Sequence, residues 1–166
     1  MNRRTMMGSI ATACAGVAVL ARADGRNGEA DAMADRFAAA LTAHDMSAFA
    51  ALLADDYRNH QMSAASPPLP PGKSSKQATI DLFTARLAGM PDLVVTVEMV
   101  VANVDKVAAS FVYSGTHDGM FLGFAPTGRK LRFTSCDIFS VRDGKLAEHW
   151  GMGDIAGVLA QLKNPS

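Results

Sequence analysis

The sequence is poor in cysteine, in tryptophan and in excess charge of either sign. Its 166 residues include two cysteines, one tryptophan and two tyrosines. Cys14 and Cys136 lie too far apart to form the closely spaced ligand pairs of a structural zinc site, and two cysteines exclude a disulfide-rich fold. Basic and acidic residues number 16 each. This balance lacks the basic field typical of nucleic-acid binding, so we expect no nucleic-acid partner.

Long hydrophobic runs are also missing, except for a weak one near the N-terminus. Arg3-Arg4 precedes an apolar run of small residues over 5–20, and Ala21-Arg22-Ala23 fits the A-x-A cleavage rule. The run is too short and too weakly apolar to predict a membrane span. We therefore expect an export signal at 1–23 and one domain at 24–166, since this length suits a single core. The domain would be periplasmic or secreted after cleavage, free of the membrane, and cytoplasmic without cleavage.

The strongest local signal is Asp143-Gly144, which separates two runs of alternating polarity. Such a pair predicts a hairpin with a two-residue type I′ turn, because both central residues need positive φ. Regular pairing from this turn would place Phe139 opposite Glu148 and Asp137 opposite Trp150. The shared side of this hairpin would then be apolar apart from a serine and two carboxylates.

Asp137 is the residue that this register makes unusual. An ionised carboxylate on a core-facing surface is costly, so it must be paired or neutralised. A carboxyl group held in that way can serve as a general acid or base. The structural alternative is a carboxylate that is satisfied by an arginine or by backbone N–H groups. The same register places His149 on the opposite side of the hairpin, away from Asp137.

The rest of the chain predicts an α+β fold with helices on one side of a curved antiparallel sheet that encloses a pocket. The proline-rich stretch at 63–73 predicts an extended loop, which either serves only as a connector or forms a lid over this pocket. An apolar glycine-containing loop at 119–128 is of the kind that covers a pocket. The expected helices cover 28–44, a short segment after Asp45, a segment after the capping box of Ser74 and Gln77, and 155–162, and the expected strands before the hairpin cover 57–61, 93–103 and 107–117.

Several short segments together resemble one family. They are Gly115-Thr116-His117-Asp118-Gly119, Pro126-Thr127-Gly128-Arg129, Asp137-Ile138-Phe139, Asp143-Gly144-Lys145 and Glu148-His149-Trp150. In this order they resemble the SnoaL-like polyketide cyclases, or ester cyclases, of the nuclear-transport-factor-like superfamily. The resemblance covers roughly residues 28–163. It implies a cone-shaped curved antiparallel sheet with three N-terminal helices and a short C-terminal helix.

The resemblance also implies a function and a site. Cyclases of this family close a ring by an intramolecular aldol reaction, in which an acidic residue shuttles a proton without metal or cofactor. Asp137 matches that position, and His117 and His60 would orient or polarise the carbonyl of a hydrophobic, polyketide-like substrate. The residues expected to bind the substrate are Trp150, which would form a wall opposite Asp137, Glu148, which is a second candidate acid, Phe139, Tyr113 and Phe121.

Other functions remain open at this point. The same fold could bind a hydrophobic small molecule without turnover, or could isomerise a ketosteroid-like compound. Epoxide hydrolysis in this superfamily relies on an Asp-Arg-Asp set, but the strand arginines Arg132 and Arg142 fall on the side opposite Asp137. We also expect a homodimer, which the outer side of the sheet could form. The outer residues of the first hairpin strand are Thr134, Cys136, Ile138 and Ser140.

Overall fold

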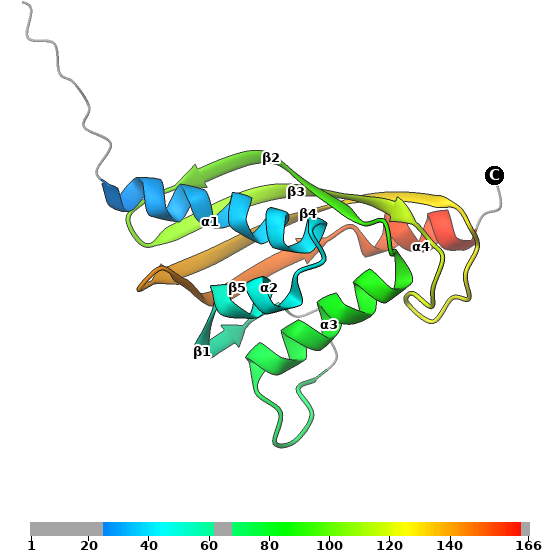
Figure 1. The fold of residues 1–166 in the computed structure, drawn as a ribbon, viewed down its shortest axis with the longest axis horizontal. Helices are drawn as coiled ribbons and strands as arrows, with labels where there is room; N and C mark the ends of the chain where they lie inside the picture. The colour runs from blue at the N-terminus through cyan, green and yellow to red at the C-terminus, as the bar shows by residue number, and fades with distance from the viewer. Residues whose placement is uncertain (1–24, 62–67, 164–166) are drawn as a thin grey trace, which may run out of the picture.

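Three helices cover one face of a five-stranded sheet in the computed structural model, which describes residues 25–61 and 68–163 (Figure 1). The predicted export signal at 1–23 and part of the proline-rich loop lie outside these residues. The elements are α1 (Gly25–Thr42), α2 (Met46–Leu52), β1 (Leu53–Asn59), α3 (Ser75–Gly89), β2 (Val94–Ala102), β3 (Lys106–Thr116), β4 (Lys130–Arg142), β5 (Lys145–Gly153) and α4 (Ile155–Lys163).

The α+β class, the three N-terminal helices and the C-terminal helix are confirmed. The strand order is β1-β5-β4-β3-β2, and the sheet is not closed. The sheet is mixed, because β1 runs parallel to β5 while the other neighbours are antiparallel. β1 begins at Leu53, before the predicted strand at 57–61, and therefore contains Asp55 and Asp56. No helix in the described part of the chain is long and apolar enough to cross a membrane.

The helix starts follow from side-chain caps that the sequence predicts. The Asp45 carboxylate accepts a hydrogen bond from the Ala48 N–H at 2.8 Å at the start of α2. The Ser74 hydroxyl accepts one from the Gln77 N–H at 3.1 Å at the start of α3. Each cap satisfies a backbone donor that a helix leaves unpaired in its first turn.

The core between helices and sheet is centred on Phe37 of α1. Its ring lies 5.4 Å from Phe49, 5.5 Å from Phe83, 5.2 Å from Phe111 and 5.5 Å from Phe139, measured between centroids. These rings come from α2, α3, β3 and β4, so one side chain links the helical layer to the middle of the sheet. Tilted and edge-on ring pairs at such distances stabilise a core beyond the area they bury.

The predicted turn at Asp143-Gly144 is confirmed. Both residues have positive φ, 52° and 69°, and the first pairs are Arg142 with Lys145 and Val141 with Leu146. The regular continuation of this register is wrong, however, because Ser140 pairs with Glu148 rather than with Ala147. One extra residue in β5 makes this a β-bulge.

The bulge at Ala147 has a packing cause. Leu146 and Ala147 are adjacent in the chain, and both are buried, at 0% and 4% exposure. A regular strand would send one of them to the outer face. The bulge keeps both inside, and every later residue of β5 faces the side opposite to the one predicted. As a result Phe139 pairs with His149, and Asp137 pairs with Gly151.

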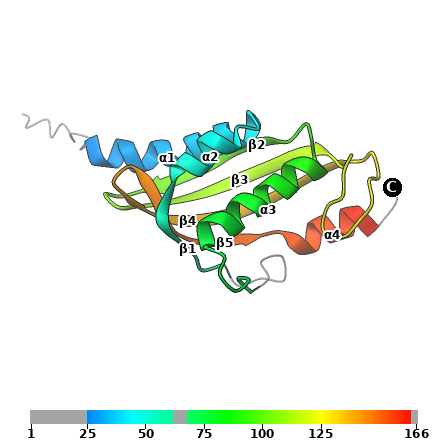
Figure 2. The same cartoon turned by 60° about the horizontal axis from the view of Figure 1, so that its bottom comes forward.

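The loop between β3 and β4 closes one end of the molecule beside α4 (Figures 1 and 2). The Arg129 guanidinium donates to the Leu162 carbonyl at 2.6 Å, which ties this loop to α4. At the end of β3, the Asp92 carboxylate accepts bonds from the Thr116 hydroxyl at 2.6 Å and from the Lys130 ammonium at 2.7 Å. Because Lys130 and Thr116 favour the ionised form, they lower the pKa of Asp92 well below its usual range.

Candidate active site

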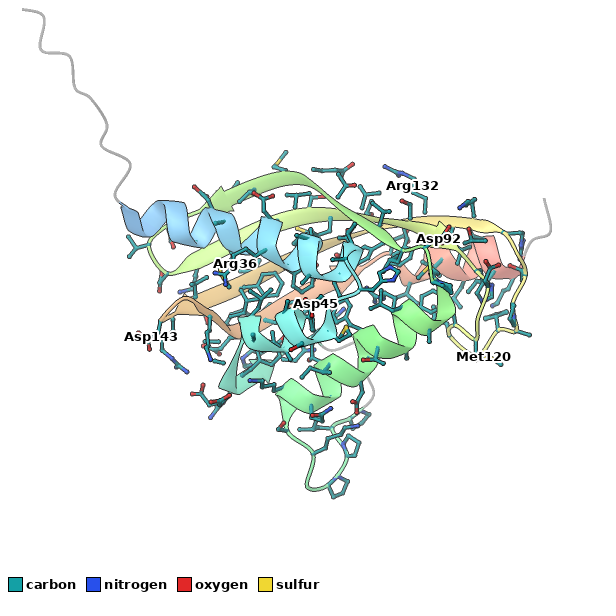
Figure 3. All side chains as sticks on the ribbon, in the orientation of Figure 1. Arg36, Asp45, Asp92, Met120, Arg132 and Asp143 are labelled. Atoms are coloured by element: carbon teal, nitrogen blue, oxygen red, sulfur yellow. The ribbon has the colours of Figure 1, made fainter. Side chains whose placement is uncertain are left out.

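A cavity of about 230 Å³ lies between α3 and the inner face of the sheet. Met120, which lines it and is 63% exposed, marks the end of the molecule opposite the Asp143 turn (Figure 3). Most lining side chains are aromatic or aliphatic, and a few polar groups lie among them, as in many small-molecule sites. The polar lining residues are Asn59, Gln61, Thr79, Arg86, Ser135, Asp137 and His149, and the aromatic ones are Phe37, Tyr57, Phe83, Tyr113, Phe121, Phe133 and Phe139.

Asp137 lies at the centre of a hydrogen-bonded chain. The residue is 5% exposed; one carboxylate oxygen lies 2.8 Å from His149 Nε2, and the other accepts from the Ser135 hydroxyl at 2.5 Å. The other ring nitrogen, His149 Nδ1, lies 3.1 Å from Asn59 Oδ1. The His149 ring stacks on Phe139 at 4.8 Å between centroids. Four strand residues thus hold one carboxylate in a fixed orientation.

The hydrogen-bond partners of Asp137 and His149 indicate how many protons the two side chains hold together. Asn59 Oδ1 accepts from the Gln61 backbone N–H at 2.9 Å, so it is the oxygen of the amide and His149 Nδ1 must donate to it. One proton then remains between His149 Nε2 and Asp137. Either Asp137 is ionised beside an imidazolium, or it is protonated beside a neutral imidazole. In both cases the Asp137–His149 pair is neutral overall.

Gly151 makes room for this pair. It is the β5 partner of Asp137, and a Cβ atom at this position would collide with Asp137 Oδ1 and with His149 Nε2. Gly153, two residues further on the same face, has only ordinary contacts at 3.8 Å or more around its Cβ position. Position 151 therefore needs a glycine because of the Asp137–His149 pair, and not because of the strand backbone.

Both tyrosines of the chain face the cavity as neutral phenols. Burial raises the pKa of Tyr113 to about 12, against the opposing effect of the nearby Arg86 charge. Burial likewise raises the pKa of Tyr57 well above its usual range. The negative charge of Asp137 pushes both pKa values in the same direction. Each phenol therefore keeps its proton at neutral pH and can donate a hydrogen bond.

Arg86 of α3 was missed by the sequence analysis, which considered only the arginines of the strands. Its guanidinium carbon lies 4.8 Å from the ring centre of Phe83 and 4.9 Å from that of Tyr113. An arginine therefore does line the cavity. A second aspartate does not occur among the described lining residues, so the Asp-Arg-Asp set of epoxide hydrolysis is still incomplete.

Four residues lie elsewhere than predicted, three of them, Glu148, His149 and Trp150, because of the bulge. His149 lies inside, whereas Trp150 and Glu148 lie on the outer face of the sheet with His60. The His60 ring stacks on the Trp150 indole at 4.6 Å and bonds to the Glu148 carboxylate at 2.8 Å. The predicted wall formed by Trp150 opposite Asp137 is therefore wrong. The adjacent apolar residues Leu146 and Ala147 are the sequence signal that could have revealed the bulge.

The remaining predicted residues lie on the inner side. Phe139, Tyr113 and Phe121 line the cavity. His117 is fully buried, but it lies beyond the lining, where its Nδ1 bonds to the Thr127 hydroxyl at 3.0 Å and its ring meets Phe121 edge-on. This contact holds the loop before β4 against the end of β3. Within residues 25–61 and 68–163, no group of three or more His, Cys, Asp and Glu side chains is placed to hold a metal ion.

Comparison with known families identifies the family of this chain. The profile of the family described as SnoaL-like polyketide cyclase matches residues 31–162. The chain belongs to this family. A comparison with functionally curated proteins gave no match. Solved structures match 80% or more of the chain, and the fold is consistent with the nuclear-transport-factor-like cone.

Three solved structures illustrate the range of SnoaL-like relatives. IdmH of Streptomyces antibioticus, provisionally assigned as a polyketide cyclase, is 31% identical with a TM-score of 0.69, over 80% of this chain and 96% of that one. AclR of Streptomyces galilaeus, provisionally assigned as a hydroxylase, is 26% identical with a TM-score of 0.72, over 84% and 85%. TsrD of Streptomyces laurentii is 26% identical with a TM-score of 0.70, over 82% and 96%.

Proposed function

We propose that this SnoaL-like protein catalyses proton transfer on a hydrophobic carbonyl compound without a cofactor, in an intramolecular aldol cyclisation. The observation that carries the proposal is the buried hydrogen bond between Asp137 and His149 in an aromatic cavity. A buried acid/base pair that shares one proton can accept a second proton and return it. An aldol closure requires these two proton transfers.

The reaction balances with the pair alone. In its ionised form, Asp137 removes a proton from the carbon next to a substrate carbonyl, and the electron pair becomes an enolate. The enolate carbon attacks a second carbonyl of the same molecule, so a C–C bond forms and an alkoxide is left. The proton returns from the Asp137–His149 pair to the alkoxide, and the site is restored with no net change.

The surroundings favour each of these steps. The phenol of Tyr113 remains protonated because burial raises its pKa, so it can donate a hydrogen bond to an enolate or alkoxide oxygen. Ser135 and Asn59 hold Asp137 and His149 in place. A correctly placed general acid or base contributes about 10²- to 10⁴-fold in rate.

The proposal can be tested without the natural substrate. We expect the protein to accelerate deuterium incorporation next to the carbonyl of 2-tetralone in deuterium oxide, measured by proton NMR. Asp137→Asn should reduce this acceleration by at least about 10²-fold, because the amide cannot accept the carbon-bound proton. The matched control is Asp56→Asn, since Asp56 is exposed and pairs with Arg142 on the outside.

The fold of each variant is checked by circular dichroism and thermal unfolding. Equal exchange rates for the wild type and for folded Asp137→Asn would refute proton transfer at this site. The same result, together with unchanged binding of 2-tetralone, would instead favour the alternative that the domain binds hydrophobic molecules without turnover.

A further inference from the structure

Arg86 is the only lysine or arginine among the described residues that line the cavity. It projects from the last turn of α3, and its guanidinium carbon lies 4.8 to 5.5 Å from the ring centres of Phe83, Tyr113 and Phe133. Three aromatic faces thus surround a charge that would otherwise be in water. Cation–π contacts offset part of the cost of this position.

The charge of Arg86 has no anionic partner in the described part of the chain. None of the ion pairs found there, at a limit of 4.0 Å, includes Arg86. Its Nε is buried and lacks a hydrogen-bond partner. The Tyr113 hydroxyl is the hydrogen-bond partner of the Arg86 side chain, but it is neutral and leaves Nε unpaired. A buried donor without a hydrogen bond is costly on a charged group, so the site is incomplete as it stands.

Asp137 does not neutralise the charge of Arg86. Its carboxylate is bonded to His149 and Ser135, and the Asp137–His149 pair is neutral as a whole. The net charge of the cavity lining is therefore positive and is centred on Arg86. A cavity that combines one net positive charge with aromatic walls is complementary to an apolar molecule that carries one negative charge.

We propose that Arg86 is an anion subsite that binds a carboxylate on an aromatic or apolar ligand. A guanidinium presents its donors in a planar fork that matches the two oxygens of a carboxylate. The inference deepens the proposed function, on which it rests for the identification of the ligand as the substrate. The carboxylate would be anchored on α3, while the carbon next to the substrate carbonyl, from which the proton is removed, faces Asp137 on β4.

A matched pair of probes tests the subsite by binding alone. 2-Naphthoate and 2-naphthamide share size and shape, and only the first is charged near neutral pH. In isothermal titration calorimetry, the wild type should bind 2-naphthoate at least about tenfold more tightly than 2-naphthamide. Arg86→Met, which keeps the apolar contacts of the side chain, should bind both probes equally.

The control is Arg132→Met, because Arg132 is exposed on the outer side of the sheet, where it lies near Glu98. This variant should keep the full preference for 2-naphthoate. If Arg86→Met does not fold, Arg86→Lys takes its place, and loss of the planar fork should reduce the preference severalfold. Equal affinity for both probes in the wild type, no binding of either probe, or a full preference in a folded Arg86 variant would overturn the proposal.

The result can be separated from the test of catalysis. Asp137→Asn should lose deuterium exchange and still prefer 2-naphthoate, because the amide leaves the charge of Arg86 unchanged. A wild type that exchanges 2-tetralone but shows no preference between the naphthyl probes would refute the anion subsite and leave the proton transfer standing.

Discussion

At the scale of single residues, Tyr113 interacts with both charged groups that the two proposals use, Arg86 and Asp137. Its ring carries the Arg86 guanidinium on one side and stacks on Phe133 at 5.1 Å. Its pKa responds in opposite directions to the charges of Arg86 and Asp137, and burial outweighs both. With its pKa raised to about 12, the Tyr113 phenol remains a hydrogen-bond donor well above neutral pH.

The two buried tyrosines predict how the free energy of unfolding changes with pH. Both are buried with raised pKa values, and the chain contains no other tyrosine. Tyrosinate absorbance of the folded protein should therefore be absent at pH values near 10, where tyrosines of the unfolded chain ionise. Between about 10 and about 12 the unfolded chain binds fewer protons than the folded one, so the free energy of unfolding should fall as pH rises.

This is measured by ultraviolet difference absorbance and by denaturant unfolding across the same pH range. Tyr113→Phe should halve the amplitude of the absorbance change and flatten the fall in stability. A folded wild type that develops full tyrosinate absorbance with an ordinary midpoint would show that the phenols reach water.

At the scale of elements, the β4–β5 hairpin builds the site through one bulge and one glycine. The turn at Asp143-Gly144 starts the hairpin, the bulge at Ala147 turns His149 inward, and Gly151 leaves space opposite Asp137. Each of these features acts on the backbone, and together they align two side chains from different strands.

Gly151→Ala should break the Asp137–His149 pair, because the new methyl group collides with an oxygen of one and a ring nitrogen of the other. We expect deuterium exchange of 2-tetralone to fall by at least about tenfold, since it depends on the acid/base geometry. The thermal midpoint should also fall by several degrees, as expected for a loss of about 1 to 2 kcal/mol in a domain of this size.

The control on the same strand is Gly153→Ala, whose added methyl meets only ordinary contacts. This variant should keep the thermal midpoint of the wild type within about a degree. A similar midpoint and exchange rate for Gly151→Ala would mean that the strands can separate enough to accept the methyl group.

The same hairpin shows how far sequence reasoning reaches. Turn chemistry is local, so Asp143-Gly144 predicted the turn, and alternation predicted that Asp137 and Phe139 face inward. The bulge depends on whether the core accepts Leu146 and Ala147 side by side, which is a property of the surrounding packing. Arg86 was missed for a related reason, since the helix periodicity of α3 does not show which strands its last turn will meet.

At the scale of the whole molecule, the outer face of the sheet carries apolar side chains that the helices do not cover. Ile138, Trp150 and Met152 are 43%, 38% and 79% exposed, and Ile138 pairs directly with Trp150 across β4 and β5. Neighbouring exposed apolar residues of this kind are typical of protein–protein contacts. We expect this face to join two copies of the chain.

Sedimentation equilibrium tests this expectation. The purified domain should sediment as a dimer at micromolar concentration, and Ile138→Asp should shift it to a monomer, because a charge placed opposite its symmetry mate is repelled and desolvated. Met120→Asp is the control, since Met120 is exposed at the end of the cavity and not on the sheet (Figure 3). A wild type that is monomeric throughout the concentration range would contradict the dimer.

The position of Trp150 has a practical consequence for ligand screening. The indole is the only one in the chain and stacks on His60 outside the cavity, with the sheet between it and any bound molecule. Intrinsic fluorescence would therefore report association of subunits and would remain silent when the interior is filled. A screen that relies on tryptophan quenching would discard true ligands, whereas calorimetry or NMR would retain them.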